Sequence, residues 1–248
     1  MNNPFSLEDK TILITGAASG IGKCVAESAA EMGASLILVD LNRERLEATL
    51  ANMPERNHLL IATDLTEVEN LESIAASIGP IDGLVNCAGI GLTLPFKFSG
   101  KDEHKKVMAI NFYAPVLLTQ TLIKRKKINK KASVVYMASI DGTVTGHIGN
   151  SIYSATKGAI LGSVRSQALE LASKGIRVNC VSPARVNTPL LQRDNISDEQ
   201  VKANMQLYPM KRYAEPYEIA YYIIYLLSDV STYTTGSNLV IDGGFTLL

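Results

Sequence analysis

Tyr153 and Lys157 stand four residues apart in the stretch "YSATK". On a helix, residues with this spacing lie on one face, one turn apart. An ammonium group beside a phenol favours the phenolate by Coulomb attraction, which lowers a tyrosine pKa that is ordinarily about 10. The pair therefore predicts a tyrosine that exchanges a proton with a substrate oxygen near neutral pH.

Ser139 precedes this pair and ends the β-rich run 133–139, "SVVYMAS". In an open parallel sheet, the side chains at the carboxyl ends of the strands face the ligand crevice. We therefore expect the Ser139 hydroxyl to face the same crevice as the Tyr153 and Lys157 pair.

A second group of residues could bind a cofactor. The stretch "TGAASGIG" (15–22) places Gly16, Gly20 and Gly22 between a buried strand and a good helix former. In a dinucleotide-binding turn, one glycine makes the tight turn, another lets the backbone approach the pyrophosphate, and a third lets helix and strand pack closely. The N–H groups at the helix N-terminus then face the phosphates. The alternative is a plain strand-to-helix turn.

Asp40 ends the next β-rich run, "SLILVD" (35–40). A carboxylate at this position can hydrogen-bond the adenosine ribose hydroxyls, and it repels the extra phosphate of NADP. Leu41 and Asn42 follow it, rather than Arg or Lys, and the glycine-rich turn carries Ser19. We therefore predict NAD(H) as the cofactor, with NADP the less favoured choice. The alternative is that Asp40 only caps the following helix.

The elements that must position these residues alternate along the chain. Runs that are nearly continuous in Ile, Leu and Val alternate with helical stretches, which is typical of strands buried on both faces of a parallel sheet. We predict one α/β domain over residues 1–248, with a doubly wound, mostly parallel seven-stranded sheet and helices on both faces. The stretch 187–215 holds no strand pattern, and we expect it to be a substrate lid. The predicted strands are 11–16, 35–40, 58–63, 83–89, 133–139, 176–182 and 238–244.

Over almost its whole length the chain resembles the short-chain dehydrogenase/reductase family, including members like 3-oxoacyl-acyl-carrier-protein reductase. Thr15 through Gly22 match the family pattern Thr-Gly-x-x-x-Gly-x-Gly at every fixed position, and Ser139, Tyr153 and Lys157 follow in the family's order. The resemblance implies that Asn111, in "AINFYAP", is a fourth catalytic residue that distorts its helix and holds a water linking Lys157 to solvent. It also identifies Arg212 and Glu218, in "PMKRYAEPYEIA", as structural.

The resemblance also implies a cofactor site. An Asp at position 64 would contact the adenine, and "NCAG" (86–89) resembles the family's Asn-Asn-Ala-Gly with Cys87 in place of the second Asn. "SPARVNTPL" (182–190) resembles the family's Pro-Gly-x-x-x-Thr, with Ala184 in place of Gly, which is tolerated only where φ is negative. The full predicted set is Gly16, Ser19, Gly20, Ile21, Gly22, Asp40, Leu41, Asp64, Leu65, Asn86, Ala88, Gly89, Tyr153, Lys157, Pro183, Val186 and Thr188.

The charge balance, the apolar runs and the cysteines of the chain indicate which partners and which cellular compartment to expect. Lys plus Arg and Asp plus Glu are 24 each, so no global field draws the protein to nucleic acid or to an anionic membrane. No uninterrupted apolar run reaches about 18 residues, and we expect no membrane span. The three cysteines and three histidines show no disulfide or metal-ligand spacing, so we expect no metal and a reducing, cytoplasmic setting.

These observations lead to one function hypothesis and two alternatives. We expect an NAD-dependent enzyme that interconverts a small or medium secondary alcohol and its ketone. A 3-oxoacyl-acyl-carrier-protein reductase of NADPH type is the nearer alternative, for which the basic run "KRKKINKK" (124–131) would dock the carrier; otherwise that run is a solvated helix end. A non-catalytic NAD-binding regulator is the other. The resemblance implies a tetramer or dimer through the helices 101–128 and 151–174, and leaves open whether Arg185 and His147 contact substrate.

Overall fold

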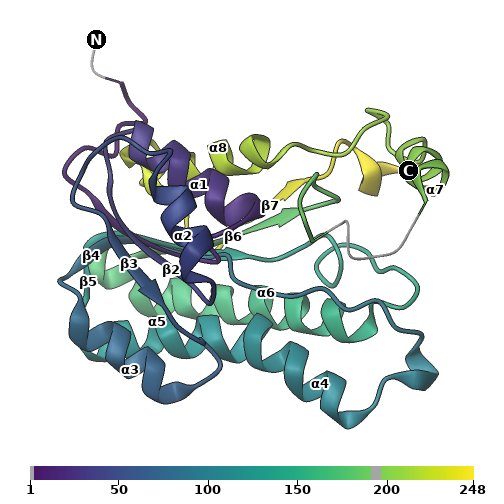
Figure 1. Ribbon diagram of the computed structural model, residues 1–248, viewed down its shortest axis with the longest axis horizontal. Coiled ribbons are helices and arrows are strands. Elements are labelled where there is room, and N and C mark those ends of the chain that lie inside the picture. The colour runs from purple at the N-terminus through teal and green to yellow at the C-terminus, as the bar shows by residue number, and fades with distance from the viewer. Residues whose placement is uncertain (1–2, 191–196) are drawn as a thin grey trace.

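The computed structural model describes residues 3–190 and 197–248 (Figure 1). Its seven strands form one sheet in the order β3-β2-β1-β4-β5-β6-β7, and each of its six pairings is parallel. The predicted doubly wound α/β fold is therefore confirmed. The strands are β1 (Thr11–Thr15), β2 (Ser35–Asp40), β3 (Leu59–Ala62), β4 (Ile81–Asn86), β5 (Ile128–Met137), β6 (Arg177–Pro183) and β7 (Asn238–Ile241).

Helices cover both faces of the sheet (Figure 1). One layer holds α3 (Val68–Ser77), α4 (Lys101–Met108), α5 (Ala114–Lys124) and α6 (Ser151–Leu171). The other holds α1 (Gly20–Glu31), α2 (Arg43–Leu50) and α8 (Pro216–Leu227), while α7 (Asp198–Met205) lies at the edge of the molecule near the C-terminus.

The buried side chains explain why the strands are continuous in apolar residues. Leu13 and Val134 point into the core beneath α5 and α6, whereas Ile12 and Val135 belong to the core beneath α1 and α8. Successive side chains on a strand face opposite sides of the sheet, so both faces of these strands must be apolar. Each fully buried aliphatic side chain contributes roughly 1.5–3 kcal/mol to folding.

Strand β5 begins earlier than the predicted 133–139. Ile128 pairs with Ile81, and the register then shifts before Gly83 pairs with Ser133. The basic run 124–131 is therefore more than a helix end, because its last four residues belong to β5.

The segment Lys101–Lys124 is long and apolar enough to span a membrane by length and composition alone. Our expectation rested on uninterrupted apolar runs and overlooked this helix. In the fold it comprises α4, a π-helical turn (Ala109–Tyr113) and α5. Its apolar stripe, with Val107, Leu118 and Leu122 buried, packs against the neighbouring helices and the sheet, so we interpret it as a core helix.

Candidate active site

A cavity of about 750 Å³ runs along the carboxyl ends of the strands. Asp40 and the glycine-rich turn line one part of it, and Ser139, Tyr153 and Lys157 line another. The strand order reverses between β1 and β4, and ligands of open α/β sheets bind at such a switch point. Two groups of residues that lie far apart in the sequence therefore share one space.

The glycine-rich turn has the close contacts that the sequence predicts. Gly16 has a φ of +71°, and a Cβ there would lie 2.9 Å from the backbone of Ala88. A Cβ on Gly22 would lie 2.2 Å from the Gly16 carbonyl oxygen. Gly16 therefore makes the tight turn, and Gly22 lets the start of α1 pack against it.

The N-terminus of α1 opens onto the same cavity. Gly20, Ile21 and Gly22 line the cavity. The N-cap, Ser19, makes no side-chain capping bond, and the first turn, which is fully described, holds no acidic residue. The free N–H groups and positive dipole end of this turn fit the phosphates of a dinucleotide.

Asp40 ends β2 with its carboxylate in the cavity wall. One carboxylate oxygen accepts from the Ala18 N–H at 3.2 Å, and the other accepts from the Asn42 N–H at 3.1 Å. Asn42 is the residue that caps α2, because its side chain accepts from the Arg45 N–H at 2.9 Å. The capping alternative for Asp40 is therefore wrong, and its position fits contact with an adenosine ribose.

Asp64 and Leu65 follow β3 and also line the cavity. The Asp64 carboxylate accepts from the Thr66 N–H at 2.8 Å and from the Thr66 hydroxyl at 2.7 Å. These bonds lower the pKa of Asp64. Glu67 holds the N-cap position of α3, so Asp64 shapes the turn before that helix rather than capping it.

Thr15 ties the glycine-rich turn to "NCAG". Its hydroxyl oxygen accepts from the N–H groups of Cys87 and Ala88 at 3.1 and 3.2 Å. Cys87, Ala88 and Gly89 all line the cavity. In the sequence Thr15 only matches a pattern, and these two hydrogen bonds are the physical reason for a threonine there.

Asn86 corrects one predicted contact. Its side chain is 3% exposed and donates to the Thr119 hydroxyl at 3.2 Å, and among the described residues that line the cavity Asn86 does not appear. Side chains alternate along a strand, and Asn86 points toward α5, whereas Cys87, which follows it, lines the cavity. Asn86 therefore connects β4 to α5 rather than lining the cavity.

Ser139, Tyr153 and Lys157 come together as predicted. The Lys157 ammonium lies 5.5 Å from the centre of the Tyr153 ring and donates to the Met137 carbonyl at 2.8 Å. The Ser139 hydroxyl oxygen accepts from the Asp141 N–H at 3.1 Å. A hydrogen bond with Ser139 favours the Tyr153 phenolate.

The expected lowering of the Tyr153 pKa is wrong for the protein groups alone. Burial raises the pKa of Tyr153 to about 12, the hydrogen bond with Ser139 offsets part of this rise, and the Asp141 charge adds to it. Burial also lowers the pKa of Lys157 to about 8. Desolvation penalises the charged form of both groups and is the largest cause of both shifts.

Asn111 lies behind the cavity and lines no part of it among the described residues. It is 2% exposed and stands in the π-helical turn, so its helix is distorted as predicted. Its side chain accepts from the Ile90 N–H and donates to the Ile90 carbonyl, both at 2.9 Å, and donates to Thr156 at 3.3 Å. Asn111 therefore fixes the backbone beside Gly89 and Lys157.

The segment after β6 closes the cavity near Tyr153. Pro183, Ala184, Val186 and Thr188 all line it. Ala184 is absent from the described residues with positive φ, so alanine is tolerated where the family pattern has glycine. Of the predicted lid 187–215, residues 191–196 lie outside the described residues.

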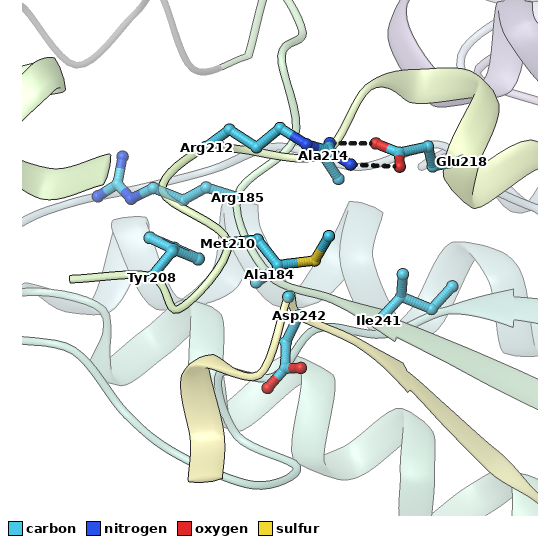
Figure 2. A pocket seen from close by; sticks show the side chains of 10 residues that line it. Ala184, Arg185, Tyr208, Met210, Arg212, Ala214, Glu218, Ile241 and Asp242 are labelled. Atoms are coloured by element: carbon cyan, nitrogen blue, oxygen red, sulfur yellow. Dashed lines mark hydrogen bonds and ion pairs between the residues drawn. The ribbon is translucent and has the colours of Figure 1, made fainter. Parts of the chain in front are cut away.

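The end of the predicted lid segment lines a second, smaller pocket of about 80 Å³ with Tyr208, Met210, Arg212 and Ala214 (Figure 2). Figure 2 shows the Arg212 guanidinium facing the Glu218 carboxylate in two parallel bonds, of 2.6 and 2.8 Å. Glu218 also accepts from the Glu215 N–H at 2.9 Å at the start of α8. The structural role predicted for this pair is therefore supported by its geometry.

Several residues line the cavity that no sequence motif indicates. His147, whose contact with substrate the sequence leaves open, lines the cavity together with Tyr208, whereas Ile148, the next residue along the chain, is 97% exposed. Asp141, Asn150 and Arg185 line the cavity as well. No motif marked Asp141 or Asn150 in the sequence.

Burial raises the pKa values of Cys24, Cys87 and Cys180, and all three are free thiols.

Comparison with known proteins agrees with this geometry. A family model described as enoyl-(acyl carrier protein) reductase matches residues 16–246. The oxidoreductase UcpA of Escherichia coli K12 is 36% identical, with 97% of this chain and 96% of UcpA covered. The 3-oxoacyl-[acyl-carrier-protein] reductase FabG of Rickettsia bellii is 33% identical (98% and 100%), and the D-threitol dehydrogenase of Mycolicibacterium smegmatis is 35% identical (98% and 95%).

The chain is also similar in structure to a solved member of the family. The short-chain dehydrogenase/reductase from Brucella melitensis titled glucose/ribitol dehydrogenase matches with a TM-score of 0.91 and 31% identity, covering 98% of this chain and 99% of that one. Fold, cavity and relatives agree: this chain belongs to the short-chain dehydrogenase/reductase family and is an NAD(P)-binding oxidoreductase.

Proposed function

We propose that the protein interconverts a secondary alcohol and its ketone with NAD(H), and that Tyr153 is the general acid/base. One observation carries this proposal. Ser139, Tyr153 and Lys157 line the same cavity as Asp40 and the glycine-rich turn. A substrate oxygen at Tyr153 and a dinucleotide along the strand ends would therefore share one continuous space.

Each residue of the proposed active site has a separate role. Tyr153 removes the hydroxyl proton of the alcohol, or returns a proton to the carbonyl oxygen in the reverse direction. Ser139 orients that oxygen. Lys157 attracts the developing phenolate and would hold the nicotinamide ribose, while Asn111 fixes the adjoining backbone. When bound, the nicotinamide supplies the hydride chemistry.

Asp40 supports NAD(H) rather than NADP(H). A carboxylate at the ribose end hydrogen-bonds hydroxyls and repels a phosphate. Both of its oxygens already accept backbone N–H bonds, which hold the carboxylate in place in the cavity wall. Arg45 also lines this part of the cavity. Assays with NAD(H) and with NADP(H) test whether the positive charge of Arg45 offsets the negative charge of Asp40.

Reduction of a carrier-bound 3-oxoacyl group is the less favoured alternative. FabG relatives carry that name, but the basic run 124–131 is poorly placed to dock a carrier at the cavity. The backbone carbonyl of Lys127 accepts from the Ile81 N–H at the start of β4. The basic run therefore lies at the amino ends of the strands, whereas the cavity lies at their carboxyl ends. We therefore expect a substrate that is free in solution.

Apolar side chains on the outer helix faces support an oligomer. Tyr113 is 53% exposed, and Leu169 is 82% exposed on α6. Both lie in the segments expected to pack between subunits. We propose a dimer or tetramer, which light scattering of the purified protein measures directly; a monomer at micromolar concentration would contradict it.

A panel of secondary alcohols and ketones tests the proposed activity. Each compound is offered with NAD(H) and with NADP(H), and nicotinamide absorbance reports turnover. We expect turnover with NAD(H) and little with NADP(H). A preference for NADPH together with carrier-bound acyl substrates would favour the alternative.

A further inference from the structure

The loop between β5 and α6 holds a polar cluster that the Ser139, Tyr153 and Lys157 chemistry does not use. It consists of Asp141, His147 and Asn150, and all three line the large cavity. The Asp141 N–H donates to the Ser139 hydroxyl at 3.1 Å, so the cluster borders the place where the reacting oxygen would lie.

Hydrogen bonds fix the cluster tightly. One Asp141 carboxylate oxygen lies 2.5 Å from His147 Nδ1, and the other accepts from the Asn150 amide at 2.7 Å. The Asp141 side chain is only 7% exposed, whereas the His147 side chain is 36% exposed. Asp141 is therefore the buried support, and His147 is the member that a ligand can reach.

Two neighbouring segments hold the His147 ring in place. The ring stacks on Phe245 with centroids 5.6 Å apart, and Phe245 stacks on Tyr208 at 4.7 Å. Asn150 in turn accepts from the Thr93 hydroxyl at 3.2 Å. A side chain held in this way loses little conformational freedom on binding, which makes it a good contact point for a ligand.

The chemistry of the pair defines what His147 can bind. Burial alone would raise the pKa of Asp141, but the hydrogen bonds from His147 and Asn150 lower it overall, so the carboxylate is ionised and accepts the Nδ1 proton. In a neutral imidazole the other nitrogen, Nε2, then carries a lone pair. Among the described residues no hydrogen bond engages Nε2, so it can accept one from a ligand hydroxyl.

Charge around the cluster narrows the class of ligand. The ionised Asp141 disfavours an anionic group, and Arg185, which acts electrostatically on Asp141, disfavours a cationic one. A neutral group with O–H donors meets neither penalty. We propose that His147, positioned by Asp141, binds a second hydroxyl group of the substrate, so that the enzyme prefers a polyol, or its hydroxyketone, over a simple alcohol. This inference rests on the proposed alcohol–ketone activity.

Matched substrates and variants test it. The wild type is assayed with NAD on 2,3-butanediol and ribitol, and on 2-butanol and 2-pentanol as mono-hydroxy controls. His147→Phe keeps a ring to stack on Phe245 but removes both nitrogens, and His104→Phe, on the exposed part of α4, is the matched control. We expect His147→Phe to lower kcat/KM for a polyol by about tenfold, the effect of one lost hydrogen bond, and to leave the mono-hydroxy alcohols unchanged.

Binding separates this inference from the proposed function. NADH fluorescence measures the Kd of each alcohol in the ternary complex without turnover. If wild type binds and oxidises diols and simple alcohols equally well, or if His147→Phe weakens both equally, the inference is overturned and the proposed activity stands. Diol binding that depends on His147, in a protein that oxidises no alcohol, would support the inference and contradict the proposed function.

Discussion

Asn111 holds Ile90 at both of its backbone polar groups: its amide oxygen accepts from the Ile90 N–H and its amide nitrogen donates to the Ile90 carbonyl, each at 2.9 Å. Asn111→Leu leaves both groups without a partner in a partly buried setting. We expect it to destabilise the fold by about 2 kcal/mol and to lower kcat, because Ile90 lines the cavity.

Chemical denaturation and steady-state kinetics measure these two effects. Asn52→Leu is the matched control, since Asn52 is exposed and bonds only within its own turn. An Asn111→Leu protein with unchanged stability and kcat would show that these two bonds are dispensable.

Asp40→Ala should raise the use of NADP relative to NAD. The substitution removes a carboxylate that would face the extra phosphate, and like charges opposed at a binding site cost several kcal/mol. We expect the ratio of kcat/KM values for NADP and NAD to rise by roughly tenfold or more. Glu44→Ala, on the exposed face of α2, should leave this ratio unchanged. Equal ratios in wild type and Asp40→Ala would remove the basis for our cofactor assignment.

Asp141→Asn should shift the pH dependence of alcohol oxidation toward lower pH. In the proposed mechanism, oxidation needs the Tyr153 phenolate, so its rate should rise with pH toward the tyrosine pKa. Burial, and to a lesser extent the Asp141 charge, raises that pKa to about 12. Removing that charge lowers the Tyr153 pKa and moves the rising limb to lower pH. The profile of kcat/KM against pH reports the shift, with Asp102→Asn on α4 as the control. A shift to higher pH, or none, would contradict this electrostatic coupling.

Glu218→Gln should destabilise the protein only where the carboxylate is ionised. Hydrogen bonds from Arg212 and from the Glu215 N–H lower the pKa of Glu218 from 4.5 to about 2. The folded pKa lies below the unfolded one, so this stabilisation is complete above about pH 4.5 and is lost as the pH falls toward 2. The pair is partly exposed, which limits the effect to about 1 kcal/mol at pH 7.

Thermal melts of wild type and Glu218→Gln at several pH values check this. The gap in Tm should close as the pH falls below 4.5. A gap that stays constant with pH would mean that the substitution acts through packing rather than through charge.

The sheet was predictable because a strand buried on both faces must be apolar throughout, as Ile12 and Leu13 illustrate on opposite sides of β1. Gly16, Tyr153 and Lys157 were predictable because their roles depend on local spacing. Asn86 was not, since only the pleat of β4 decides which way it points. The Asp141–His147 pair was not either, because it forms across an irregular loop that follows no period. The Tyr153 pKa depends on burial, which spacing alone does not reveal.

We propose above all that Tyr153 carries the proton in an NAD-dependent reaction. Tyr153→Phe removes only the hydroxyl and is assayed on the best alcohol of the panel, with NADH binding measured by fluorescence on the same preparation. We predict that kcat falls by roughly 10²–10⁴-fold while the Kd for NADH stays unchanged. Turnover at the wild-type rate with intact NADH binding would contradict the account.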